Sequence, residues 1–156
     1  MGKLWELDSY LLEEKLIPNT TIIEYDLQSA STSIAAEFGL LSDEMIARFN
    51  KLPKGDRNRA IGLYKRDHKE YGDMEKAGFM QARKMFFEQN DLAVSRVIAI
   101  KRDAIFVEGE VFCTRLTDHL NFRKKNEYTS YLNLNSLEIF YRKNFGLDVK
   151  KMNREV

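Results

Sequence analysis

The 156-residue sequence contains one cysteine, two prolines and no long apolar run. Because Cys113 is alone, an intramolecular disulfide and a cysteine-based zinc site are excluded, and its apolar neighbours Val111 and Phe112 favour simple burial. The apolar runs all fall short of the roughly 20 residues that a membrane-spanning helix needs. Acidic residues interrupt the N-terminal segment, so we expect no signal peptide. The expected location is the cytoplasm, with no membrane partner.

The chain has almost no net charge, with 25 lysines and arginines against 24 aspartates and glutamates. This balance excludes a generic polyanion binder such as a histone, so a contact with nucleic acid has to come from a local patch. The two histidines, His68 and His119, lie far apart without metal-ligand spacing. P-loop, dinucleotide-binding and serine-nucleophile motifs are also missing from the sequence.

Hydrophobic periodicity predicts a single α+β domain over residues 1–156, with a mostly antiparallel sheet and helices packed on one face. Gly39 is expected just after a helix, and Ser42 is expected to cap the next one. The expected helices cover residues 3–16, 29–38, 42–49, 56–71 and 74–90. The expected strands are residues 20–25, a hairpin around Asp103, residues 110–113, and one or two strands within 128–140. The charged tail, residues 143–156, is expected to end in a frayed segment.

Two aspartates stand out because each follows an apolar, β-prone run. Asp26 comes at the expected end of the first strand, and hydroxyl-bearing residues follow it into a helix. Asp103 lies at or beside the turn of the expected hairpin. Carboxylates on neighbouring strands are the hard oxygen ligands that two Mg²⁺ or Mn²⁺ ions need for phosphoryl transfer. The alternative is that Asp26 caps a helix and Asp103 is a turn residue neutralised by Lys101 and Arg102.

Two basic clusters are candidates for contacts with nucleic acid. On the expected helix 56–71, Arg59, Arg66 and Lys69 can share one flank, where they would present cations to phosphate. Farther along, Arg123, Lys124 and Lys125 precede Tyr128, which is a basic and aromatic grouping of the kind that follows a nucleic-acid backbone. The alternative for the first cluster is a solvated helix face, and for the second a charged loop.

Two short blocks resemble the palm domain of the family B DNA polymerases. The family's first block has the form Asp-x-x-Ser-Leu-Tyr-Pro-Ser-Ile, and Asp26, Ser29, Ser33 and Ile34 match it. The second is close to Asp-Thr-Asp-Ser-Ile-Phe-Val, which resembles residues 101–107, Lys-Arg-Asp-Ala-Ile-Phe-Val. The two blocks occur in the family's order, with a helical segment between them. The resemblance implies a palm-like fold, a nucleoside triphosphate substrate and metal-binding roles for Asp26 and Asp103.

The sequence also departs from that pattern. Lys101 replaces the first aspartate of the second block, and Ser31 replaces the tyrosine that discriminates against ribose in the family. The family places a phosphate-binding lysine seven residues before a Tyr-Gly pair, whereas Lys65 lies six residues before Tyr71. We therefore treat Lys65 and Arg66 as candidate phosphate contacts. Arg123, Lys124 and Lys125 resemble in character the family's basic block that grips primer and template.

Three functions fit these observations. The first is a minimal polymerase-like nucleotidyltransferase that acts on nucleic acid, with a protein partner supplying the missing fingers and thumb. The second is a non-catalytic palm-like protein of phage or mobile-element origin that binds nucleic acid or a replication or defence protein. The third is an unrelated α+β interaction module.

Overall fold

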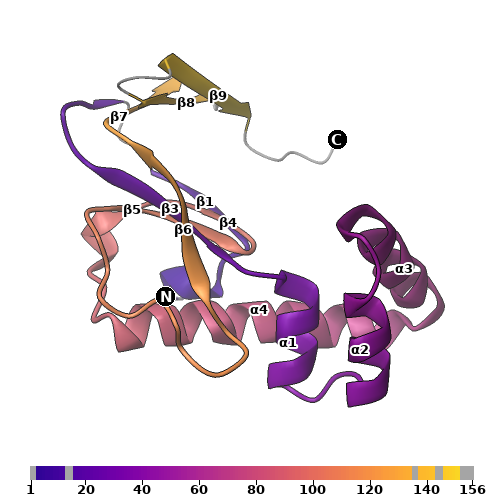
Figure 1. The fold of residues 1–156 in the computed structure, drawn as a ribbon. Helices are drawn as coiled ribbons and strands as arrows, with labels where there is room; N and C mark the ends of the chain where they lie inside the picture. The colour runs from indigo at the N-terminus through magenta and orange to yellow at the C-terminus, as the bar shows by residue number, and fades with distance from the viewer. Residues whose placement is uncertain (1–2, 13–15, 135–136, 143–145, 152–156) are drawn as a thin grey trace.

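The computed structural model describes residues 3–12, 16–134, 137–142 and 146–151. Within them, helices and two antiparallel sheets form an α+β fold, which confirms the predicted class (Figure 1). The helices are α1 (Ala30–Glu37), α2 (Asp43–Asn50), α3 (Lys54–Asp67) and α4 (Lys69–Gln89), with 3-10 turns η1 (Leu4–Glu6) and η2 (Val94–Arg96). The strands are β1 (Ser9–Leu11), β2 (Leu16–Ile17), β3 (Ile22–Leu27), β4 (Val97–Lys101), β5 (Ala104–Glu108), β6 (Phe122–Tyr128), β7 (Ser130–Leu134), β8 (Leu137–Arg142) and β9 (Gly146–Lys151).

The main sheet has the strand order β1-β4-β5-β3-β6, and every neighbouring pair in it is antiparallel. Strand β3 lies between β5 and β6, although β5 begins 77 residues and β6 begins 95 residues after β3 ends. In this register Asp26 lies opposite Ala104 on one side and Arg123 on the other. Asp26 therefore neighbours the β4–β5 hairpin turn in space.

The side chains on the two faces of β3 pack in two different hydrophobic cores, because side chains alternate in direction along a strand. Ile23 and Tyr25 pack with Phe86 of α4, the long helix that runs beneath the sheet in Figure 1. Ile22 faces the other way and packs with Phe140, which comes from the smaller sheet β2-β7-β8-β9. The helices thus cover one face of the main sheet, and Asp26 lies on the opposite face by alternation.

Helices α1 and α4 approach closely at Gly78, which is buried in the middle of α4. A Cβ atom at this position would lie 2.6 Å from Cγ2 of Ile34 on α1. Gly39 follows α1 with φ +65°, and the Leu40 amide donates to the Ala35 carbonyl at 2.9 Å, as predicted for a helix C-terminus. The predicted cap of α2 is also confirmed, because the Ser42 hydroxyl accepts from the Met45 amide at 3.2 Å.

Three predictions about elements are wrong. Residues 3–12 do not form the predicted helix apart from the 3-10 turn η1, because β1 pairs with the edge of β4 and this distant partner overrides the local apolar pattern. Tyr71 lies in the first turn of α4 rather than at the end of a helix. Residues 110–113 form no strand, and Phe112 is 79% exposed beside a half-buried Cys113. Within the tail, residues 146–151 form β9, which pairs with β8, and the end that was predicted to be frayed lies outside the described residues.

Candidate functional site

Asp26 and Asp103 come together at one end of the main sheet. Asp26 is the penultimate residue of β3, and Asp103 belongs to the two-residue turn between β4 and β5. The Leu27 amide donates to the Asp103 carbonyl at 2.9 Å, so the two main chains are bonded beside the acids. Both residues line one pocket of about 270 Å³.

The helix-cap interpretation of Asp26 does not hold in the structure, whereas Asp103 does lie in the hairpin turn. Asp26 does not cap α1, whose N-cap is Ser29 with φ +48°. The Asp26 carboxylate instead accepts from Arg123 Nε at 3.2 Å, and its side chain is 13% exposed. Arg102 bonds Glu75 rather than Asp103. Burial raises the pKa of the Asp103 carboxyl, and the charges of Arg102 and Lys125 offset only part of this rise.

The hairpin turn is fixed by its main chain. Arg102 has φ +54°, in the left-handed region that suits a two-residue hairpin turn. Its amide donates to the Asp8 carbonyl at 2.7 Å, and its carbonyl accepts from Arg83 Nη1 at 3.0 Å. Arg83 is 1% exposed and also bonds the Asp8 carboxylate and the Trp5 carbonyl. Contacts to the N-terminal segment and α4 therefore hold Asp103 in place.

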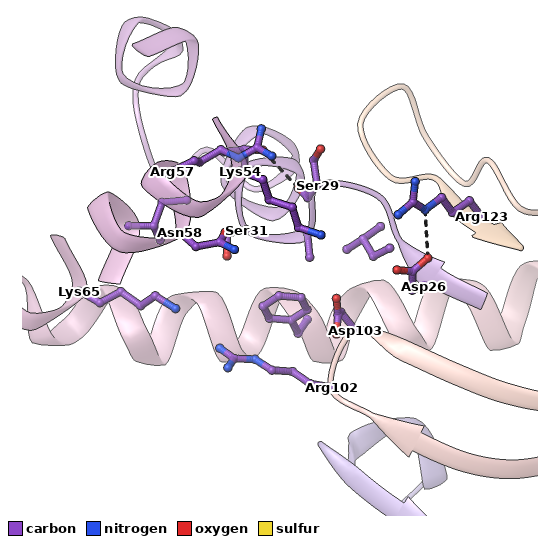
Figure 2. A pocket seen from close by; sticks show the side chains of 15 residues that line it. Asp26, Ser29, Ser31, Lys54, Arg57, Asn58, Lys65, Arg102, Asp103 and Arg123 are labelled. Carbon is purple, nitrogen blue, oxygen red and sulfur yellow. Dashed lines mark hydrogen bonds and ion pairs between the residues drawn. The ribbon is translucent and has the colours of Figure 1, made fainter. Parts of the chain in front are cut away.

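Cations surround the rest of the pocket (Figure 2). Helix α3 contributes three basic residues, the hairpin contributes Arg102, and β6 contributes Arg123. The basic residues that line the pocket are Lys54, Arg57, Lys65, Arg102 and Arg123. Ser29, Ser31 and Thr32 add hydroxyl groups at the start of α1. The pocket thus combines an acidic end with a cationic wall, as expected for a site that binds both a metal ion and phosphate groups.

The electrostatic environment of Asp103 shows that the two acids influence each other. Burial raises the pKa of the Asp103 carboxyl, and the negative charge of Asp26 raises that pKa further. A divalent cation between the carboxylates would relieve this repulsion. Across the described residues no three His, Cys, Asp or Glu side chains gather into a metal-binding group. Two carboxylates alone supply only part of the oxygen ligands that Mg²⁺ takes, and phosphate or water would have to supply the rest.

The predicted phosphate contacts divide into two groups. Lys65 lines the pocket and donates from Nζ to Glu75 Oε1 at 2.7 Å. Arg66 lies outside the pocket lining, is exposed and pairs with Asp67 at 3.5 Å. Arg59 is likewise exposed outside the lining, 3.7 Å from Asp56. Lys65 is therefore the one of these three residues that shares the pocket with Asp26 and Asp103.

The basic cluster of β6 is exposed, but its aromatic member is not. Arg123, Lys124 and Lys125 are all exposed at the edge of the main sheet, and Lys124 pairs with Glu110 and Glu127. Tyr128 is 0% exposed and its ring centroid lies 4.8 Å from that of Phe140. The prediction that Tyr128 contacts nucleic acid is wrong, because its ring is buried in the core that contains Ile22 and Phe140.

Sequence reasoning missed three residues of the site. Lys54 and Arg57 line the pocket from the first turn of α3, which begins two residues earlier than predicted. Their spacing of three places both on one helix face, and this spacing was the available signal. Glu75 is fully buried in α4 and bonds two of the pocket cations. Nothing in the local sequence distinguishes Glu75 from a surface glutamate.

Comparisons with known proteins agree with a phage origin. A family model described as "Bacteriophage PBS1 gene 130 protein" matches residues 1–156. The chain belongs to this family. No curated protein matches it. Among the described residues of this phage family member, no helix combines the length and apolar content needed to cross a membrane.

Proposed function

We propose that this phage protein is a palm-like nucleotidyltransferase that binds a nucleoside triphosphate with Mg²⁺ or Mn²⁺ in the pocket of Asp26 and Asp103. The observation that carries the proposal is that Asp26 from β3 and Asp103 from the β4–β5 turn share a pocket with five cationic side chains. A metal–triphosphate complex has the matching charges, with a cation for the acidic end and phosphates for the cationic wall.

The two ends of the pocket would perform different tasks. Asp26 and Asp103 would hold the metal ions. The ions would lower the pKa of the attacking hydroxyl and neutralise charge on the leaving phosphate. Lys54, Arg57 and Lys65 would bind and orient the phosphate groups from α3. Phosphoryl transfer depends mainly on such positioning and charge stabilisation, so these side chains provide the kind of assistance that the reaction needs.

The resemblance to family B polymerases supports the same proposal. The block that begins at Asp26 runs from the end of β3 into α1, and the block around Asp103 forms the β4–β5 hairpin. Both blocks therefore occur in the strand contexts that the resemblance implies. A protein partner would supply the fingers and thumb, and Arg123 and Lys125 lie beside the pocket where a nucleic-acid strand would pass.

Nucleotide incorporation tests this proposal directly. A labelled nucleoside triphosphate is incubated with a primer–template and the protein in Mg²⁺ or in Mn²⁺. Incorporation should depend on the metal and be lost in Asp26→Asn and in Asp103→Asn. Asp56→Asn is a matched control, because Asp56 is exposed and outside the pocket lining. Equal incorporation by all four proteins would exclude a catalytic role for the two aspartates.

A second function is favoured by the ion pair between Arg123 and Asp26. This guanidinium occupies an oxygen that a metal would need, as expected for a non-catalytic palm-like protein that binds nucleic acid through β6. In that case the triple change Arg123→Ala, Lys124→Ala and Lys125→Ala should abolish binding of single-stranded DNA or RNA, while Asp103→Asn leaves it intact. Unchanged binding by the triple variant would leave the third possibility, an unrelated interaction module.

A further inference from the structure

Glu75 connects two cations that reach the pocket from different elements. Its Oε1 atom accepts from Lys65 Nζ at 2.7 Å and from Arg102 Nη2 at 3.0 Å. Lys65 belongs to α3 and Arg102 to the hairpin turn, so the carboxylate bridges segments 37 residues apart in sequence. Glu75 itself is 0% exposed, whereas the side chains of Lys65 and Arg102 are 28% and 55% exposed. The anion is therefore enclosed and the cations face outward.

Helix α4 contacts Arg102 at three successive positions along one face. Residues four apart share a helix face, and Glu75, Phe79 and Arg83 have this spacing. Glu75 bonds the Arg102 guanidinium, the Phe79 ring lies 5.0 Å from its central carbon, and Arg83 bonds its carbonyl. Both ends of Arg102 are thereby fixed. Helix α4 thus holds the Arg102 side chain both by its charge and by its flat face.

The second oxygen of Glu75 also shows that the carboxylate is not optimised for stability. Oε2 is buried and has no hydrogen-bond partner among the described residues. An enclosed carboxylate with an unsatisfied oxygen is costly, so its position needs a reason beyond holding the fold together. The exposed cations that it holds supply one.

We propose that Glu75 is a positioning residue that holds Lys65 and Arg102 as a preformed pair for the polyphosphate of the substrate. This inference rests on the proposed function, because it names how that pocket recognises the triphosphate. Flexible lysine and arginine side chains lose conformational entropy when they bind a ligand, and holding them in advance reduces this cost. Asp103 immediately follows Arg102, so the same contacts set the place of the phosphates relative to the metal ligands.

Binding of inorganic tripolyphosphate in EDTA, measured by calorimetry at low ionic strength, tests the pair without metal. The wild-type protein should bind it, and Lys65→Met should weaken binding about tenfold, the loss of one charge-assisted hydrogen bond. Glu75→Gln should weaken binding similarly. The double variant Glu75→Gln with Lys65→Met should weaken binding by less than the product of the two single-variant losses, because both changes disrupt the same pair. Glu88→Gln, on the exposed side of α4, and Lys51→Met, at an exposed position outside the pocket lining, are the matched controls and should bind like wild type.

Glu75→Asp separates position from charge. It keeps the buried negative charge but shortens the side chain, so both bonds cannot form together and binding should again fall severalfold. Unchanged affinity in this variant, or tighter binding by Glu75→Gln, would overturn the inference and show that Glu75 merely neutralises the cations. No tripolyphosphate binding by the wild-type protein would also overturn it. Because EDTA removes the metal, these outcomes are independent of Asp26→Asn and Asp103→Asn incorporation assays, whose failure would bear on the proposed reaction instead.

Discussion

The amide of Leu27 donates to the carbonyl of Asp103 at 2.9 Å, and this bond joins the end of β3 to the β4–β5 turn. It places Asp26, one residue before Leu27, beside Asp103 by main-chain geometry. Main-chain hydrogen bonds in a sheet hold their positions better than the long side chains of a loop. The approach of the two acids is therefore a property of the fold and does not depend on a bound metal.

Removal of Asp26 should lower the pKa of Asp103. Burial is the larger cause of the raised pKa and would remain in Asp26→Asn, but the repulsion between the two charges would disappear. The NMR chemical shift of the Asp103 carboxyl carbon, followed over pH, gives the titration midpoint in the wild-type protein and in the variant. The wild-type midpoint should lie above the usual value for aspartate, and the variant midpoint should lie lower. Identical midpoints would mean that the two carboxylates do not interact.

The same shift predicts a pH dependence of stability. A carboxyl with a raised pKa in the folded state favours folding when protonated, so the free energy of unfolding should fall as pH rises through that pKa. Asp103→Asn should remove this part of the fall, and the variant should be more stable than wild type at neutral pH. Denaturant unfolding at several pH values provides the measurement. Parallel curves for the two proteins would contradict the prediction.

Arg123→Gln should increase the affinity for Mg²⁺ or Mn²⁺. The guanidinium bonds Asp26 Oδ1 at 3.2 Å and is half exposed, so it competes with a cation for the same oxygen. We expect a severalfold lower dissociation constant for the metal ion by calorimetry, since a partly exposed ion pair such as this one contributes only modest energy. Arg59→Gln removes a charge outside the pocket lining and controls for the change in net charge. An equal effect of both variants would mean that the Asp26 pair is irrelevant.

Gly78→Ala should destabilise the fold by about 1–3 kcal/mol, because its Cβ would lie 2.6 Å from Ile34 Cγ2 and force α1 away from α4. Gly72→Ala is the matched control on α4, since nothing lies within 4 Å of a Cβ there. That change should stabilise the protein by up to about 1 kcal/mol through helix propensity. Urea unfolding measures both variants. Stabilisation by Gly78→Ala would show that the two helices can separate at little cost.

Arg83→Met should destabilise the protein by about 3 kcal/mol, because it leaves the Asp8 carboxylate and the Arg102 carbonyl without a buried donor. Lys76 also pairs with Asp8, at 3.6 Å, but its side chain is 71% exposed. Lys76→Met should therefore change stability by less than about 1 kcal/mol. Thermal or urea unfolding distinguishes the two. Comparable effects would contradict the importance assigned to the buried arginine.

The parts of the fold that were predictable have strong local signals. The β4–β5 hairpin, α1 with Gly39 and α2 with Ser42 all follow from short patterns of periodicity and capping. The helix predicted over residues 3–16 was wrong because the apolar residues there are shared between two cores and because β1 is stabilised by β4, almost 90 residues away. Local helical periodicity contains no information about such a partner.

The candidate site was predictable in the same uneven way. Asp26 and Asp103 were identified because each follows a β-prone run, and strand pairing brings the runs together. Glu75 and Arg83 were missed because each is one charged residue in a polar helix, and their roles arise from where α4 lies under the hairpin. Tyr128 was misassigned because an aromatic residue beside three cations has the same local pattern whether its ring is exposed or buried.

The measurement that tests the central claim most directly is calorimetric titration with Mg²⁺ or Mn²⁺ in the presence of a nucleoside triphosphate. Wild-type protein, Asp26→Asn, Asp103→Asn and the control Asp56→Asn are compared under the same conditions. The account predicts that metal tightens triphosphate binding by wild type and by the control, and that this tightening is lost in both Asp26→Asn and Asp103→Asn. Triphosphate binding that metal does not tighten, or that metal still tightens in either of those two variants, would contradict a shared metal–triphosphate site.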